Sequence, residues 1–287
     1  KKDAEIAVIE MGANHLHEIE SYCQYAMPTH GLITNCGKAH LEGFGSEENI
    51  KKAKGELFNY LRVHGGTAFI LTHTGYLDAM SKGIKQIITY GSADADYMAE
   101  PAEMDSSYLK LNITKGLSQP TLQTQLVGSY NLPNVLAALC IGKTFSVPDE
   151  KIKASIENYS PSNSRSQLIE KNGNKIILDA YNANPSSMTL AIENFAGLRG
   201  NKVLIIGSMM ELGQAADEEH ERIVDLITTF SWKAVVLTGN GFKKIPAHFL
   251  HFNNVEETAE WYKKQQFKDC LILIKGSRSM QMEKLLD

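Results

Sequence analysis

The sequence predicts an α/β protein with two successive sheets, the first mostly parallel with added antiparallel strands and the second Rossmann-like and doubly wound. In both halves, short apolar runs alternate with stretches of helical spacing, which is typical of parallel sheets. Between residues 97 and 127 the pattern changes to polar–apolar alternation, typical of half-exposed antiparallel strands. A polar, proline-marked connector at residues 160–164 separates the halves. We therefore expect one domain over residues 1–160 and another over residues 161–287.

Composition narrows the classes of function. The 287 residues suffice for two cores, and 43% hydrophobic with 22% charged residues is ordinary for a globular protein. A net charge of −4 argues against a general nucleic-acid or anionic-membrane binder, and no apolar run reaches the ~18 residues of a membrane span. The four cysteines are scattered without a C-x-x-C pair, which favours a reducing, cytoplasmic compartment. The chain starts without methionine or signal peptide, so we expect it to be part of a larger protein.

The first half opens on a β-branched apolar run that ends at Gly12, where we expect a strand with Glu10 near its end. Pro28 stops the helical pattern that follows, and Ser46 is placed to cap a later helix. The expected strands are at residues 4–11, 31–34, 67–71 and 86–90. The expected helices are at residues 16–25, 46–62, 130–145 and 149–159, with one more from about residue 75.

The second half repeats strand–helix alternation, which predicts a doubly wound, largely parallel sheet. The expected strands are at residues 176–180, 202–206, 234–238 and 270–275. The expected helices are at residues 186–198, 217–230, 255–265 and 279–286.

The stretch at residues 33–58 holds the first candidate site. A strand leads into a glycine-punctuated loop with His40, and the next helix carries Lys54. Loops that follow parallel strands meet at one sheet edge, where ligands bind, and Glu10 would lie at the same edge. Magnesium sites there use few protein ligands together with phosphate oxygens. We therefore predict a Mg-nucleotide site; the alternative is an exposed loop histidine beside a solvated, lysine-rich helix face.

Several motifs in order resemble those of the Mur ligases, over essentially the whole chain. They are ITNCGKAHLEGFGS (33–46), AKGELF (53–58), GSYNLPNVLAA (128–138), DAYNANPSS (179–187), GSMMELG (207–213) and KGSRSM (275–280). The resemblance implies a partial central ATPase domain followed by a complete C-terminal ligase domain.

The resemblance also implies roles for single residues. Glu10 and His40 match the family's magnesium ligands, and Lys54 matches a lysine that CO₂ converts to a carbamate, whose oxygens suit a hard cation. The residues implied to contact the nucleotide are Asn131, Asn134, Arg165, Asp179, Tyr181 and Asn182. Those implied to contact the substrates are Asn184, Lys275, Ser277 and Arg278. Glu211 and His220 are taken by default as structural residues or as residues that support the site. A helix N-cap remains the alternative for Asn131.

The implied reaction is ATP-dependent amide formation in peptidoglycan precursor synthesis. ATP phosphorylates the terminal carboxylate of UDP-N-acetylmuramoyl-tripeptide, and the amine of D-alanyl-D-alanine then displaces phosphate. ATP contacts on both sides of the connector suggest that the second domain closes during turnover. We expect a cytoplasmic monomer with no nucleic-acid or membrane partner.

Some features depart from the family pattern. No G-x-x-x-x-G-K-[ST] phosphate loop occurs, so we expect this chain alone to be inactive. Ser208 stands where relatives often have an acid, and Ser164 where glycine is usual. Two alternatives stay open: a related ligase, either another Mur-type ligase or one like folylpolyglutamate synthase, and a non-catalytic nucleotide-binding module.

Overall fold

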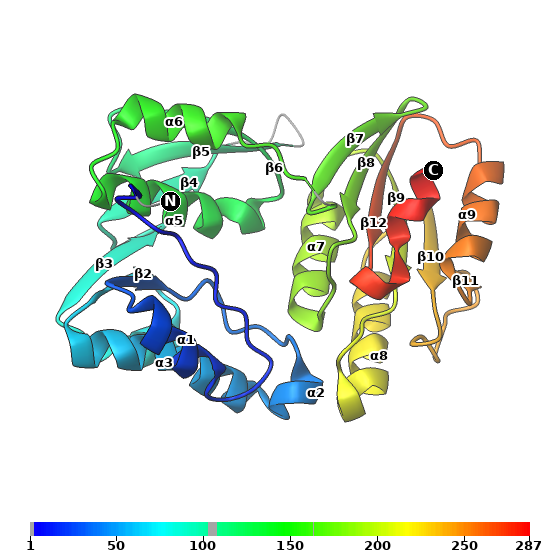
Figure 1. The fold of residues 1–287 in the computed structure, drawn as a ribbon. Helices are drawn as coiled ribbons and strands as arrows, with labels where there is room; N and C mark the ends of the chain where they lie inside the picture. Colours follow the sequence, from blue (N-terminus) through cyan, green and yellow to red (C-terminus); the bar gives the residue numbers. More distant parts are fainter. Residues whose placement is uncertain (1–2, 103–107, 163) are drawn as a thin grey trace.

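The computed structural model describes residues 3–102, 108–162 and 164–287. Its strands form two six-stranded sheets that lie side by side, one in each half of the chain (Figure 1). Within the described ranges, no helix combines the length and apolar character needed to cross a bilayer.

The first sheet has the strand order β1-β2-β3-β4-β5-β6. Strands β1 to β4 pair in parallel, whereas β4, β5 and β6 pair antiparallel, which confirms the change of pattern after residue 97. Residues 103–107 of that stretch lie outside the described residues. The strands are β1 (His30–Leu32), β2 (Thr67–Leu71), β3 (Gln86–Gly91), β4 (Tyr97–Pro101), β5 (Tyr108–Lys115) and β6 (Thr121–Val127).

Helices cover both faces of this sheet. Side chains on β2 alternate between the faces, so Phe69 joins the apolar cluster around α5 while Ala68 and Ile70 join the cluster around α3. Burial on both faces is the usual state of parallel strands. The helices are α1 (Glu18–Ala26), α2 (Leu41–Phe44), α3 (Glu47–His64), α4 (Gly75–Ser81), α5 (Leu132–Thr144) and α6 (Asp149–Asn158).

The second sheet has the order β11-β10-β9-β12-β8-β7 and is parallel except for the β7–β8 pair. Leu204 and Ile206 of β9 face the cluster that includes α7 and α8, and Val203 and Ile205 face the opposite cluster. The strands are β7 (Gln167–Lys171), β8 (Asn174–Asp179), β9 (Asn201–Gly207), β10 (Ala234–Thr238), β11 (Leu250–Phe252) and β12 (Cys270–Lys275). The helices are α7 (Pro185–Gly197), α8 (Ala216–Thr228) and α9 (Val255–Lys264).

The expected strand at residues 4–11 is wrong. This segment is irregular, and its side chains Ile6, Val8 and Ile9 are 50%, 92% and 56% exposed. A β-branched run becomes a strand only where a neighbour supplies backbone partners, and in the described structure β1 pairs with β2 alone. Glu10 therefore lies on an exposed irregular segment and not at the end of a buried strand.

Three smaller differences concern short elements. Strands β7 and β11 were not expected; both lie at sheet edges, and β11 has only three residues, too few to show a period. The predicted helix at 279–286 is instead two 3₁₀ segments, η3 (Arg278–Met280) and η4 (Met282–Leu286). Gln281 between them has a left-handed φ of 50°, which interrupts an α-helix.

Candidate active site at the contact of the two halves

The loop after β1 and helix α3 bring Lys54 to the start of the site. Ser46 caps α3, since its Oγ accepts a hydrogen bond from the Asn49 backbone N at 3.2 Å. Lys54 then lies on the third turn, where its Nζ donates to the Asn35 carbonyl oxygen at 2.6 Å. Burial lowers the pKa of the Lys54 ammonium. At a given pH, a larger fraction of Lys54 is therefore the neutral amine than for an exposed lysine.

His40 lies in the same loop and contacts the other half of the chain. It is the N-cap residue of α2 and has a left-handed φ of 54°. Its Nδ1 lies 2.5 Å from Oε2 of Glu211, which follows β9 in the second half. The Glu42 backbone N also donates to the Glu211 carbonyl oxygen at 3.1 Å. His40 is therefore held at the contact between the halves.

Lys38 makes a second connection across the halves. Its Nζ lies 2.8 Å from Oε1 of Glu219 on α8, and its backbone N donates to Ser186 Oγ on α7 at 3.0 Å. The hydrogen bond to the buried Glu219 raises the pKa of the Lys38 ammonium. Leu41 packs against the core clusters of both halves. The loop that carries His40 thus contacts several elements of the second half.

The predicted metal site fits a divalent cation only under one condition. No group of three or more His, Cys, Asp or Glu side chains suited to a metal occurs in the described ranges. As an ammonium, Lys54 has no lone pair to offer a cation. As a carbamate it would offer oxygens, which is the chemistry Mg²⁺ prefers. The donor types of Glu10, His40 and Lys54 therefore suit Mg²⁺ only with Lys54 carbamylated, and their convergence on one metal stays a prediction.

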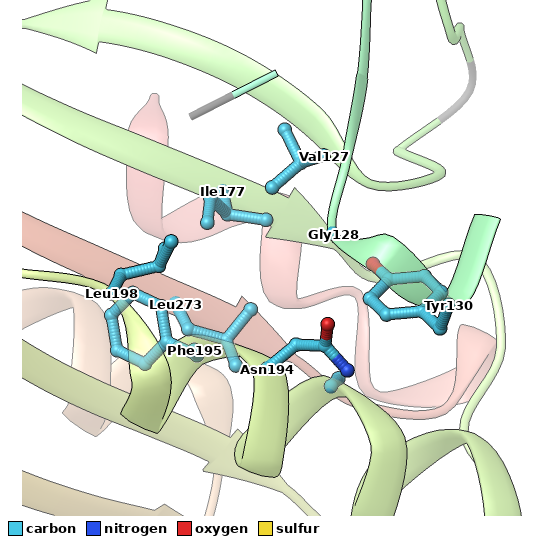
Figure 2. Close-up of a pocket in the computed structure, with 9 residues that line it drawn as sticks. Val127, Gly128, Tyr130, Ile177, Asn194, Phe195, Leu198 and Leu273 are labelled. Carbon is cyan, nitrogen blue, oxygen red and sulfur yellow. The ribbon is translucent and has the colours of Figure 1, made fainter. Parts of the chain in front are cut away.

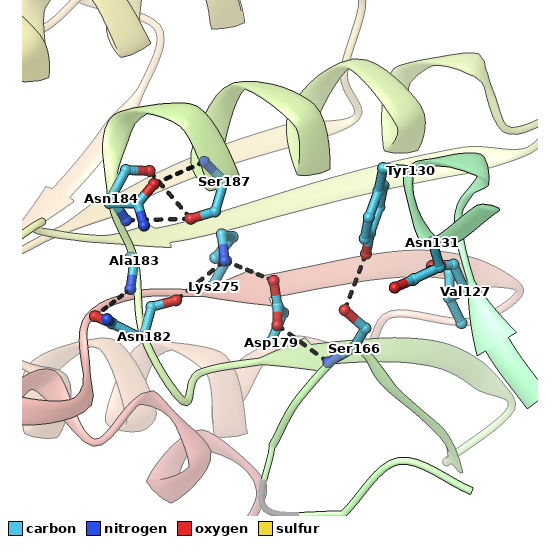
Figure 3. A network of polar contacts seen from close by, with 10 residues as sticks. All are labelled: Val127, Tyr130, Asn131, Ser166, Asp179, Asn182, Ala183, Asn184, Ser187 and Lys275. Atoms are coloured by element: carbon cyan, nitrogen blue, oxygen red, sulfur yellow. Dashed lines mark hydrogen bonds and ion pairs between the residues drawn. The ribbon is translucent and has the colours of Figure 1, made fainter. Parts of the chain in front are cut away.

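A polar network in the second half surrounds Asp179 (Figure 3). The buried Lys275 places its Nζ 2.6 Å from Asp179 Oδ2 and 3.2 Å from the Asn182 carbonyl oxygen. Asp179 Oδ1 accepts from the Ser166 backbone N at 3.1 Å, and Ser166 Oγ lies 2.9 Å from the Tyr130 hydroxyl. Burial raises the pKa of Tyr130 to about 12, so its hydroxyl is protonated at neutral pH. This network joins β12 to the first half through η1 (Ser129–Asn131).

Arg165 stands between two left-handed serines. Ser164 and Ser166 have φ values of 57° and 48°, in a region where a glycine would be less strained. The Arg165 guanidinium carbon lies 3.7 Å from the centroid of the Tyr181 ring, and both residues are exposed. A guanidinium over an aromatic ring can still offer N–H donors to phosphate oxygens.

The two asparagines expected near the adenine contact each other. Asn131 is buried, and its Nδ2 donates to the Val127 carbonyl oxygen at 2.8 Å. Asn134 Nδ2 donates to Asn131 Oδ1 at 3.0 Å. Asn131 occupies the N-cap position of α5 but makes no side-chain capping bond, so capping does not account for it.

A small cavity of about 20 Å³ lies beside these residues (Figure 2). Gly128 and Tyr130 line it from the first half, and Asn194 and Phe195 from α7. This volume holds about one water molecule and not a nucleoside. A larger cavity of about 320 Å³ lies beside His30 and Thr67, at the amino ends of β1 and β2 and away from His40.

Two family models match the chain. The Mur ligase middle domain matches residues 1–142, and the Mur ligase glutamate ligase domain matches residues 164–278. The chain belongs to the Mur ligase family.

Individual relatives agree with this assignment. The UDP-N-acetylmuramoyl-tripeptide–D-alanyl-D-alanine ligase of Haemophilus influenzae is 30% identical over 289 residues, covering 98% of this chain and 63% of the relative. A crystal structure of MurF from Acinetobacter baumannii superposes with a TM-score of 0.87 at 26% identity, covering all of this chain and 65% of that one. MurF from Thermotoga maritima in complex with ADP has a TM-score of 0.83 at 24% identity, covering 96% of this chain and 65% of that one, and shows the fold alone. This Mur ligase chain therefore spans slightly under two thirds of these proteins.

The residues expected to face the substrates are largely engaged inside the Mur ligase C-terminal domain. Asn184 caps α7 in a reciprocal capping box with Ser187. Lys275 and Ser277 are buried, and Ser277 Oγ donates to the Ser208 carbonyl oxygen at 2.9 Å. Arg278 is exposed and pairs with Glu283 at 2.8 Å. Their contact with a substrate stays a prediction.

Sequence reasoning missed several residues that join the halves, among them Lys38, Tyr130, Ser166, Ser186 and Glu219. Lys38 and Tyr130 lie inside recognised motifs, yet a motif names no partner. Lys38 meets Ser186 and Glu219 across 148 and 181 residues of sequence. No local spacing rule predicts such contacts.

Proposed function

We propose that this chain carries part of the ATP site and the ligase domain of an enzyme that joins D-alanyl-D-alanine to UDP-N-acetylmuramoyl-tripeptide. The observation that carries the proposal is the loop of His40, which lies between a desolvated Lys54 and residues of the second half. The name of the Haemophilus influenzae relative and the complex of Thermotoga maritima MurF with ADP support the substrates.

The proposed reaction has two steps. The terminal carboxylate of the tripeptide attacks the γ-phosphorus of ATP, giving an acyl phosphate and ADP. The amine of D-alanyl-D-alanine attacks the acyl carbon, phosphate leaves, and the amine loses a proton. Arg165 binds phosphate oxygens from its place on Tyr181, and Asn131 with Asn134 contacts the adenine. Holding the reactants together is the main contribution of such residues to the rate.

The proposed cofactor is Mg²⁺, held by Glu10, His40 and carbamylated Lys54, which would neutralise phosphate charge when bound. The carbamate forms when the neutral amine attacks CO₂ and releases a proton, so the lowered pKa of Lys54 favours it. With ¹³C-labelled bicarbonate, we expect a carbamate resonance that is lost in Lys54→Arg and kept in Lys52→Arg. Its presence unchanged in Lys54→Arg would contradict the assignment.

The function is tested in a polypeptide in which a phosphate-loop segment precedes these residues. We expect phosphate release that requires both UDP-N-acetylmuramoyl-tripeptide and D-alanyl-D-alanine. Release with a folate and glutamate instead would favour the folylpolyglutamate synthase-like alternative. Tight ATP binding by the 287-residue chain alone, measured by calorimetry, would contradict the expectation that it is inactive and favour a nucleotide-binding module.

The compartment, the oligomeric state and the domain boundary belong to the same proposal. We infer a cytoplasmic monomer whose domains divide at residues 160 and 161, with no nucleic-acid or membrane partner. Sedimentation of the chain at several concentrations tests the monomer, since self-association would raise the apparent mass with concentration.

A further inference from the structure

We propose that Glu211 is a positioning residue, which fixes the tautomer and orientation of the His40 ring from the opposite half of the molecule. The inference deepens the proposed function and rests on the role of His40 in it. The pair joins two loops that lie 171 positions apart in the chain, by one contact of 2.5 Å between His40 Nδ1 and Glu211 Oε2.

The chemistry of the pair sets the tautomer. An ionised carboxylate only accepts hydrogen bonds, so His40 Nδ1 must carry the proton that it donates to Glu211. In the neutral ring, Nε2 is then the nitrogen with a free lone pair. A carboxylate on the far nitrogen is the arrangement that usually orients a histidine toward a ligand. Glu211 thus leaves Nε2 as the binding atom of His40.

The backbone at both residues is held in an unfavourable conformation. His40 and Glu211 have φ values of 54° and 61°, a left-handed region that costs a non-glycine residue about 1–2 kcal/mol. The hydrogen bond from Glu42 N to the Glu211 carbonyl oxygen joins the same two loops. Strained residues persist where the surrounding contacts fix them, and here both meet at one histidine–carboxylate hydrogen bond.

The loop of Glu211 is held in place by a hydrogen bond to α8 and by a buried side chain. Met209 N donates to His220 Nε2 at 2.9 Å, and the His220 Nδ1 proton goes to the Ala216 carbonyl oxygen at 2.7 Å. Leu212 is buried in the core of the second half. The Glu211 side chain itself is 56% exposed, and even fully charged pairs contribute little stability when they are exposed. The main effect of this contact is therefore to orient the His40 ring, and its contribution to stability is small.

The test reads the tautomer directly from ¹⁵N spectra of the histidine rings, recorded at pH 8.5, above the usual imidazole pKa of about 6.5. His40→Gln assigns the His40 signals among the nine histidines. Glu211→Gly removes the carboxylate while allowing the left-handed backbone, and Glu211→Asp keeps an acceptor-only group. Glu218→Gln changes an exposed carboxylate that pairs with Arg222 and serves as the matched control.

We expect wild type, Glu211→Asp and Glu218→Gln to show mainly the Nδ1–H form of His40. In Glu211→Gly the Nε2–H form should become the major one, with the other histidine signals unchanged as evidence of folding. Unchanged His40 signals in Glu211→Gly would overturn the proposal, as would an equal shift in Lys38→Met, which breaks a different contact between the halves. These spectra do not depend on catalysis, so a missing ligase activity would overturn the proposed function alone.

Discussion

The two halves complete their polar groups in different ways. In the second half, Lys275 and Asp179 form a buried pair on adjacent strands, with Ser166 and Asn182 satisfying the remaining atoms. In the first half, the loop that carries His40 finds its partners in the other half of the chain. The comparison teaches that the Lys275–Asp179 pair is completed within one half, while the loop of His40 is completed only when both halves are assembled.

Lys275→Met should have the largest effect, because Lys275 is buried and pairs with Asp179 inside the second half. It leaves Asp179 partly buried without its cation, and such losses cost about 3–5 kcal/mol. Urea unfolding of the chain measures the change, with Lys284→Met as control, since Lys284 and Glu256 form an exposed pair. A loss below about 1 kcal/mol would mean that the second half does not depend on this pair.

Lys38→Met tests the connection between the halves. It removes one cation from the buried Glu219, which keeps Arg222, so we expect a loss of about 1–2 kcal/mol. Hydrogen exchange should quicken in residues 37–42 and stay constant in β12. Lys243→Met, in an exposed pair with Asp217, is the control. Equal hydrogen-exchange rates at residues 37–42 in Lys38→Met and Lys243→Met would show that Lys38 does not connect the halves.

Tyr130→Phe removes the hydroxyl that joins the first half to Ser166 and should cost about 1 kcal/mol. Tyr159→Phe changes an exposed ring and should cost almost nothing. Because burial raises the Tyr130 pKa to about 12, the stability from its neutral form is full below pH 10 and is lost as pH rises toward 12. Thermal unfolding between pH 7 and 11 checks both points; equal melting of the two variants would contradict the first.

His220→Gln should have the smallest effect at neutral pH and a clear one in acid. Burial lowers the pKa of His220, so the folded state favours the neutral ring. Its contribution to the free energy of unfolding is complete above about pH 6.5 and is lost as pH falls through the lowered pKa. One proton gives a slope of at most about 1.4 kcal/mol per pH unit. The variant should keep an acceptor near Met209 N and flatten the dependence between pH 7 and 5. Parallel curves for wild type and variant would contradict this.

The sequence predicted most of the fold because its strands and helices carry strong local periods. The capping of α3 by Ser46 followed from local chemistry, and α7 starts at Pro185, one residue before the expected start. The segment 4–11 failed because strand formation depends on a neighbour that periodicity cannot supply. The motifs located His40 and Lys275. They could not predict the burial of Lys275 or the pairing of His40 with Glu211, because both depend on neighbours that are distant in sequence.

The position of Leu41 in two core clusters has a consequence for the order of folding. Contacts between residues far apart in sequence form late, since closing a long loop costs entropy before any contact repays it. The loop of His40 depends on partners 148 to 181 residues away. It should therefore be among the last segments to become protected from exchange during refolding, after the two sheets, and among the first to open again.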